Sequence, residues 1–152
     1  MRKIESSDVK NLNFLKHYRI VRKWACKTCD IKEADLELLI YLEAVNMFTK
    51  DDFKKGVYSF SWDNRRWNRL LKKEWIVVWR KRNRTTQKYH IYKVSRKCKL
   101  LINRIYKILC GEEEIPENTK SNIIFKEKTY THKVLSYSIR EINKEKRKPN
   151  GL

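Results

Sequence analysis

The sequence predicts a mainly α-helical protein of 152 residues that carries one small β-hairpin. Only three Gly and two Pro occur in it, which favours long helices joined by few tight turns. Apolar residues recur three and four positions apart over most of the chain, as they do on one face of a helix. The spacing changes after residue 75, where β-branched and aromatic residues gather. With 41% apolar residues, the chain can build a core, and one domain over residues 1–152 is expected.

The first predicted helix covers residues 11–29 and has one apolar and one basic face. The apolar face is expected to hold Leu12, Leu15, Tyr18, Val21, Ala25 and Cys29. A second helix is predicted in KEADLELLIYLEAVNMF, with an apolar side of Leu36, Leu39, Ile40, Leu42 and Ala44. Its first turns carry Glu33, Asp35 and Glu37, where the helix dipole favours acidic side chains.

The segment NMFT is predicted to be a short extended link, and Thr49 is expected to cap a third helix in KDDFKKGVYSF. Ser61 would cap a fourth helix, WDNRRWNRLLKKEW, whose inner face holds Trp67, Leu70 and Leu71. Two strands follow in WIVVWRKR and KYHIYKVS, and the polar loop NRTTQ joins them. This pattern indicates a β-hairpin with a basic tip.

Helical spacing resumes in RKCKLLINRIYKILCGEEEI, which Gly111 is expected to end as a C-cap before Pro116. PENTKSN is read as a turn or linker. One more helix is predicted in the tail, with Val134, Leu135, Ile142 and either Tyr137 or Ser138 facing inward.

Positive charge is concentrated in one part of the chain. The whole sequence has 37 Lys and Arg against 18 Asp and Glu, a formal net charge of +19. Residues 62–99 hold 14 basic and 2 acidic residues, whereas residues 30–52 hold 2 basic and 7 acidic ones. Such a distribution indicates a basic face that binds a polyanion. A membrane surface is the less favoured polyanion, because the aromatic residues do not form one stripe of a basic amphipathic helix.

Other classes of function find little support in the sequence. Cys26 and Cys29 have the spacing of zinc ligands, but Cys98 and Cys110 do not repeat it, so reduced thiols are the favoured interpretation and no metal or cofactor is expected. No nucleophile–base pair, paired carboxylates or Gly-rich phosphate loop can be placed, so no enzyme activity is expected. No signal peptide or membrane span is recognised, which predicts a cytoplasmic, nucleoid-associated protein. The frequent Lys, Asn and Ile are compatible with an AT-rich, virus-encoded source.

The order helix, helix, short strand, helix, helix, hairpin, helix is that of a winged helix-turn-helix domain. Three stretches, ADLELLIYLEAVNMFT, WNRLLKKEWIVVWRKR and HIYKVSRKCKLLINRIYKIL, together resemble the MarR family of transcription regulators. The resemblance covers about Asp35 to Leu109, half of the chain. Each motif alone is common in helical proteins, and the resemblance rests on their order and spacing. It implies a DNA-binding core over 32–110 and flanking helices, 11–29 and within 117–148, that interlock in a homodimer.

The sequence departs from the family pattern at three places. Trp75 stands where the family has a glycine after the recognition helix, and the wing loop reads RKRNRTTQK without the usual acidic residue. The recognition helix begins WDNRR rather than with small hydroxyl residues. No base preference is therefore transferred to this chain.

Duplex DNA is the expected partner, read by a recognition helix over about 61–75 and held by a wing over about 76–95. Asn64, Arg65, Asn68 and Arg69 are expected to point outward, whereas Trp67 and Trp75 belong to the core. Trp62 and Trp79 are left with two interpretations, stacking on a sugar or packing beneath the wing. The candidate DNA-binding residues are Ser61, Asn64, Arg65, Arg66, Asn68, Arg69, Lys72, Arg80, Arg82, Arg84 and Lys88.

Two alternatives to a regulator remain open. The first is a packaging protein that coats nucleic acid through the same basic face, and the second is a winged helix that binds a protein in a larger, for example viral, assembly. A regulator discriminates strongly between sequences, whereas a coating protein shows mainly salt-dependent affinity. An interaction module would bind DNA weakly and co-purify with a protein.

Overall fold

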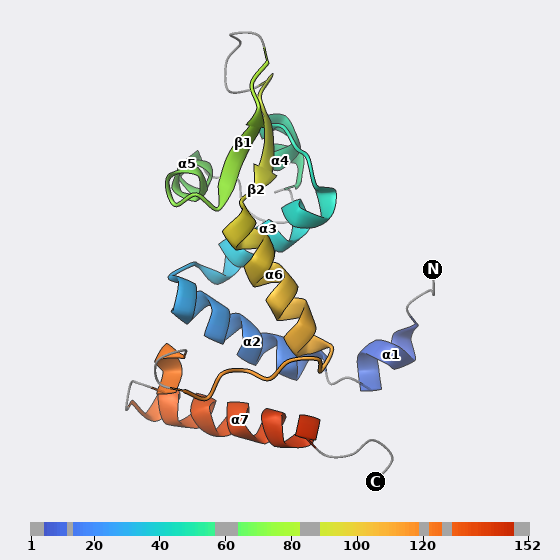
Figure 1. Ribbon diagram of the computed structural model, residues 1–152, viewed down its shortest axis with the longest axis vertical. Helices are drawn as coiled ribbons and strands as arrows, with labels where there is room; N and C mark the ends of the chain where they lie inside the picture. The colour runs from blue at the N-terminus through green and yellow to red at the C-terminus, as the bar shows by residue number, and fades with distance from the viewer. Residues whose placement is uncertain are drawn as a thin grey trace. The chain divides into compact units, whose positions relative to one another are not determined.

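Figure 1 shows a computed structural model of the chain, which describes residues 5–11, 14–56, 64–82, 89–118, 122–125 and 129–147. The chain divides into two compact units. The central unit is Lys32–Asn103, and the terminal unit combines Met1–Ile31 with Arg104–Leu152. The boundary between them falls inside the helix α6 (Arg96–Leu109).

The central unit has a winged helix-turn-helix fold, as the sequence predicts. Its two strands form an antiparallel hairpin in which Val77 is paired with Lys93 and Val78 with Tyr92. Phe48 adds a short bridge on the other side of β2, since its N–H donates to Tyr92 O and Tyr92 N–H donates to Phe48 O. The predicted extended link is thus confirmed. The elements in order are α3 (Glu33–Val45), α4 (Lys50–Gly56), α5 (Asn64–Lys72), β1 (Ile76–Arg80), β2 (Ile91–Val94) and the first part of α6.

A cluster of aromatic rings holds α5 to the hairpin. Trp67 is fully buried. Its ring centre lies 4.7 Å from that of Phe53 and 4.8 Å from that of Tyr92, and both contacts are edge-to-face. Burial also raises the pKa of the Tyr92 hydroxyl, so this group stays neutral in the core. Trp67, Leu70 and Trp75 are all buried, which confirms their predicted place in the core.

Thr49 caps α4 as predicted. Its hydroxyl accepts a hydrogen bond of 3.2 Å from Asp52 N–H, and the Asp52 carboxylate accepts one of 3.0 Å from Thr49 N–H. This reciprocal pair is a capping box in which an Asp takes the position usually held by Glu or Gln. The predicted continuation of this helix beyond Gly56 and its successor's cap at Ser61 lie outside the described residues.

The end of α5 is closed by a residue in the left-handed conformation. Glu74 has a φ of 60°, its N–H donates to Leu71 O, and Trp75 N–H donates to Leu70 O over 2.9 Å. These bonds form a Schellman motif, in which glycine is preferred at the left-handed position. The left-handed position, where glycine is preferred, is therefore occupied by Glu74. The sequence pattern predicts it one residue later, at Trp75. Lys97 adds a positive charge here, because its Nζ donates to Lys73 O and lies 4.4 Å from the Trp75 ring centre.

The terminal unit contains α1 (Ser6–Asn11), α2 (Phe14–Cys29), η3 (Ile123–Phe125) and α7 (Tyr130–Arg147), and α2 packs against α7. The predicted helix over 11–29 corresponds to α2, which begins at Phe14 and ends at Cys29 as predicted, and the short helix α1 precedes it. Trp24, which the predicted apolar face leaves out, is 2% exposed, and the Arg104 guanidinium lies 5.1 Å from its ring centre.

The inner face of α7 is partly different from the predicted one. Ile139 and Ile142 are buried, whereas Val134 is 46% exposed and Tyr137 is 65% exposed. The reason is that Leu135, Ile139 and Ile142 follow helical spacing, and Val134 falls about 100° away from Leu135 on the helix. The prediction that Val134 faces inward is therefore wrong. Of the two alternatives Tyr137 and Ser138, Ser138 is the less exposed.

A buried asparagine fixes the linker that follows α6. Asn143 Oδ1 accepts a hydrogen bond from Ile115 N–H over 3.1 Å, and its Nδ2 donates to Ile115 O over 2.8 Å. The amide thus pairs with the linker as another backbone would. Gly111 ends α6 with a φ of 81°, which confirms the predicted C-cap.

Replacing Glu74 by glycine is expected to stabilise the protein. A non-glycine residue in the left-handed region strains the folded state by about 1–2 kcal/mol, and glycine would remove this strain. Part of the gain is offset because glycine also gives the unfolded chain more conformational freedom. Glu74→Gly should therefore raise the free energy of unfolding by about 0.5–1 kcal/mol, measured by thermal or denaturant unfolding. The control Glu43→Gly, in the last turn of α3, should lower it, by up to about 1 kcal/mol. A loss of stability in both variants would contradict this account of the α5 end.

Candidate nucleic-acid interface

The helix α5 presents a mixed surface of positive charge and one amide. Trp67 and Leu70 lie at 0% and 1% exposure and turn one side of the helix to the core. The opposite side, at positions separated by three and four residues, holds exposed Arg65, Asn68 and Lys72. The amphipathic spacing thus fixes which polar residues reach the surface.

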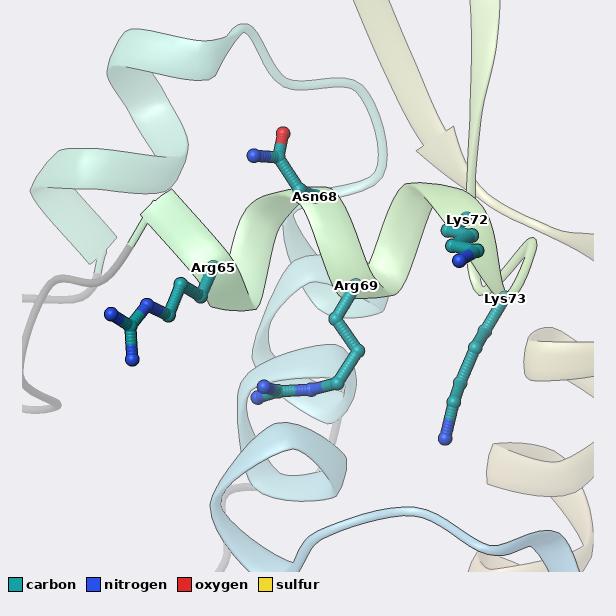
Figure 2. A pocket seen from close by; sticks show the side chains of 5 residues that line it. All are labelled: Arg65, Asn68, Arg69, Lys72 and Lys73. Atoms are coloured by element: carbon teal, nitrogen blue, oxygen red, sulfur yellow. The ribbon is translucent and has the colours of Figure 1, made fainter.

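Figure 2 shows that these side chains line a broad, open pocket along α5. The pocket has a volume of about 630 Å³. Its lining contains four basic side chains and no acidic one, namely Arg65, Asn68, Arg69, Lys72 and Lys73. Because the charges are of one sign, the surface attracts an anion.

Two arginines of α5 are bound to a carboxylate of the helix α3. Arg69 Nε and Nη2 donate to Asp35 Oδ2 over 3.0 and 2.8 Å, and Arg66 Nε lies 3.0 Å from Asp35 Oδ1 as an ion pair off hydrogen-bond alignment. The Asp35 side chain is only 2% exposed, against 14% for Arg66 and 27% for Arg69. Arg69 thus lines the pocket and is at the same time held by Asp35, because a buried carboxylate attracts both guanidinium groups.

The sequence contains a signal for this ion pair. Asp35 lies three, four and seven positions before Leu38, Leu39 and Leu42, which are all buried, so helical spacing places its carboxylate on the apolar face. A buried carboxylate needs a partner. The dipole at the start of α3 explains an acidic residue there but not its burial.

The described part of the wing is basic and exposed. Arg80, Lys81 and Arg82 all lie at the surface, and Trp79 is 50% exposed, which argues against burial beneath the wing. Arg84, Lys88 and Trp62 lie outside the described residues, as does Ser61. Asn64 begins α5, but its side chain is outside the described part of the structure.

Neither a metal site nor a membrane span is found in the described part of the chain. Among these residues, no three His, Cys, Asp or Glu side chains are grouped so that they could hold a metal ion. No disulfide joins the four cysteines. Of the described helices, none combines the length and the apolar character that crossing a bilayer requires.

Removal of the buried carboxylate should destabilise the central unit. Asp35→Ala leaves Arg66 and Arg69 without their partner, and breaking a buried pair in this way costs about 3–5 kcal/mol. We expect the free energy of unfolding, measured with denaturant, to fall by about 3 kcal/mol. This is the lower end of the range, because Arg69 retains some contact with water. The control Glu113→Ala removes the exposed ion pair with Arg104 and should cost less than about 1 kcal/mol. Equal effects of the two variants would contradict the role of Asp35.

Comparisons with known proteins give a likeness of fold. No protein-family model matches the sequence, and none of the curated proteins matches it. Solved structures that resemble the chain include two of MarR from E. coli, its reduced form at a TM-score of 0.46 and its wild-type apo form at 0.40. Each is 18% identical over 93% of this chain and 98% of that chain.

Proposed function

We propose that the protein binds duplex DNA as a transcription regulator, with α5 in the major groove and the hairpin as a wing on the backbone. The observation that carries the proposal is the pocket along α5, which four basic side chains and one amide line without any acidic residue. A helix fits the width of the major groove, and arginine and asparagine are the side chains that pair with base edges there. Phosphates account for the remaining positive charge.

Arg65 and Asn68 are the proposed base readers among the described residues of α5. Both are exposed and lie three positions apart on α5. A guanidinium can donate two hydrogen bonds to guanine O6 and N7, and an amide can pair with adenine N6 and N7. Arg66 and Arg69 belong instead to the ion pair with Asp35, so we assign them the role of holding the helix in place.

Lys72, Lys73 and the wing residues Arg80, Lys81 and Arg82 are proposed to contact phosphates. They lie at the surface, and between Ile76 and Lys99 the sequence has no acidic residue. Arg84 and Lys88 would extend the same surface through the tip of the wing. These contacts set the affinity and its salt dependence without reading sequence.

A second copy of the chain is the proposed partner of the terminal unit. Tyr130, Val134 and Tyr137 follow each other at helical spacing on α7 and are 83%, 46% and 65% exposed. Such an apolar stripe is typical of a helix–helix interface. A twofold dimer would present two copies of α5 to half-sites about one DNA turn apart.

A coating protein is the second candidate function. The ion pairs of Asp35 favour it, because they remove Arg66 and Arg69 from the residues that are available to read bases. Binding would then depend on phosphate contacts and vary little among sequences. Selection of binding sites from random duplex DNA at two salt concentrations separates the two candidates.

The roles of Asn68 and Lys72 predict different losses of DNA affinity. Asn68→Ala should cost about 1–3 kcal/mol on a selected site and much less on random duplex DNA. Lys72→Ala should weaken both and reduce the slope of log K against log salt by about 0.9. Fluorescence anisotropy over a salt series measures both quantities. Equal losses for Asn68→Ala on the selected and the random DNA would favour the coating function.

The α7 stripe predicts a concentration-dependent dimer that a negative charge disrupts. Tyr137→Glu places a carboxylate in the proposed interface, so sedimentation should show a shift from dimer to monomer at micromolar concentration. Thr131→Glu makes the same charge on a different side of α7 and should leave the dimer intact. A monomeric wild-type protein would refute the dimer and the expected twofold DNA site.

A further inference from the structure

The hairpin has a face that the winged-helix core does not use. Tyr92 points to the core, where it touches Trp67, and its strand partner Val78 shares that side of the hairpin but is 41% exposed. Because side chains alternate along a strand, the neighbouring pair Val77 and Lys93 points the other way. This second side of the hairpin is turned away from the contact with α5.

A β-bulge places two more large side chains on that side. The pairing runs regularly from Ile76 to Val78 and then shifts by one residue, so that Arg80 is paired with Ile91 and Trp79 is the extra residue. Ile91 lies two positions from Lys93 and shares its side of the sheet. Two residues of β1 thus stand opposite one of β2, and bulges of this kind redirect side chains near functional sites. The resulting outer wing face consists of Val77, Trp79, Arg80, Ile91 and Lys93.

Trp79 is the centre of this outer wing face. It is 50% exposed, although the other described tryptophans, Trp24, Trp67 and Trp75, are at most 6% exposed. Lys93 Nζ lies 4.8 Å from its ring centre, a cation–π contact that holds the indole in place. Trp79 and Val77, which is 38% exposed, together leave apolar surface open on the outer wing face, where the flat indole ring is available for stacking.

The surroundings of Trp79 are positively charged throughout. Arg80, Lys81 and Arg82 follow it along the chain and are exposed, and no acidic residue occurs from Ile76 to Lys99. A protein partner would more often bury such a tryptophan among apolar groups, since lysine is depleted in the core of protein interfaces. Aromatic rings beside basic side chains are instead the pattern of surfaces that bind single-stranded nucleic acid.

We infer that the outer wing face binds single-stranded nucleic acid, with one unpaired base stacked on Trp79 and the neighbouring phosphates at Arg80 and Lys93. A base in a duplex has both of its faces covered by its neighbours, whereas an unpaired base has a face that can stack on the indole. The inference rests on the proposed affinity for nucleic acid and adds a second binding surface beside that of α5. Duplex DNA would meet α5 and the wing, the unpaired strand would meet the outer wing face, and Arg80 would be common to both surfaces.

The test compares two probes on the same variants. The full-length protein is titrated against a labelled oligothymidylate and, separately, against a labelled duplex, with Trp79→Ala, Trp79→Phe and the exposed aromatic control Tyr41→Ala. Trp79→Ala should weaken oligothymidylate binding about 5- to 150-fold, and Trp79→Phe should retain most of the affinity. Duplex binding should be unchanged in all three variants. Melting temperatures verify that each variant is folded.

Fluorescence of the wild-type protein provides a readout that does not depend on the alanine variant. Stacking of a base on the exposed indole should quench part of the tryptophan emission when oligothymidylate binds, and Trp79→Phe should lose that quenching. Equal oligothymidylate affinity of Trp79→Ala and the wild type, or a wild type that binds duplex but not oligothymidylate, would overturn the inference. Failure of the wild type to bind duplex, with oligothymidylate binding retained and sensitive to Trp79, would overturn the α5 proposal alone.

Discussion

The arrangement of the proposed interface depends on one buried carboxylate. Asp35 on α3 is almost inaccessible to water, and the guanidinium groups of Arg66 and Arg69 on α5 compensate its charge. An ionised carboxylate is costly to bury without such partners, so α5 is restrained in its rotation about its own axis. Because Trp67 and Leu70 face the core, helical geometry leaves Arg65, Asn68 and Lys72 exposed, while Arg69 on the same pocket is tied to Asp35. The ion pairs therefore help to set how α5 presents the proposed interface.

The aromatic cluster extends this restraint from the helix to the hairpin. Trp67 of α5 is in contact with Tyr92 of β2, and Tyr92 in turn pairs with Phe48 beside α3. The side chains that face the core thereby fix the opposite side of the hairpin, where the bulge places Trp79. Both proposed surfaces, the pocket along α5 and the outer wing face, thus follow from the same packing.

Much of the fold follows from local patterns in the sequence. Apolar spacing predicts α3, α5, the hairpin and α6, and capping rules predict Thr49 and Gly111. Local patterns do not predict features that depend on contacts between residues far apart in the sequence. Asp35 shares its face with leucines, but its arginine partners lie 31 and 34 residues away, beyond the reach of any local pattern. Glu74 adopts a conformation that its residue type disfavours, and the burial of Ile139 rather than Val134 depends on what α7 packs against. In the site, composition predicts the charge but not which arginines are exposed.

The most direct test of this account compares Arg65→Ala with Arg69→Ala for both DNA affinity and melting temperature. The two arginines lie one turn apart on α5, carry the same charge and line the same pocket, yet only Arg69 is paired with Asp35. Arg65→Ala should lower the affinity for a selected duplex by about 1–3 kcal/mol and lower the melting temperature less than Arg69→Ala does. Arg69→Ala should lower the melting temperature and, measured well below it, leave the affinity nearly unchanged. An Arg69→Ala variant that melts like the wild type and loses as much affinity as Arg65→Ala would contradict the account.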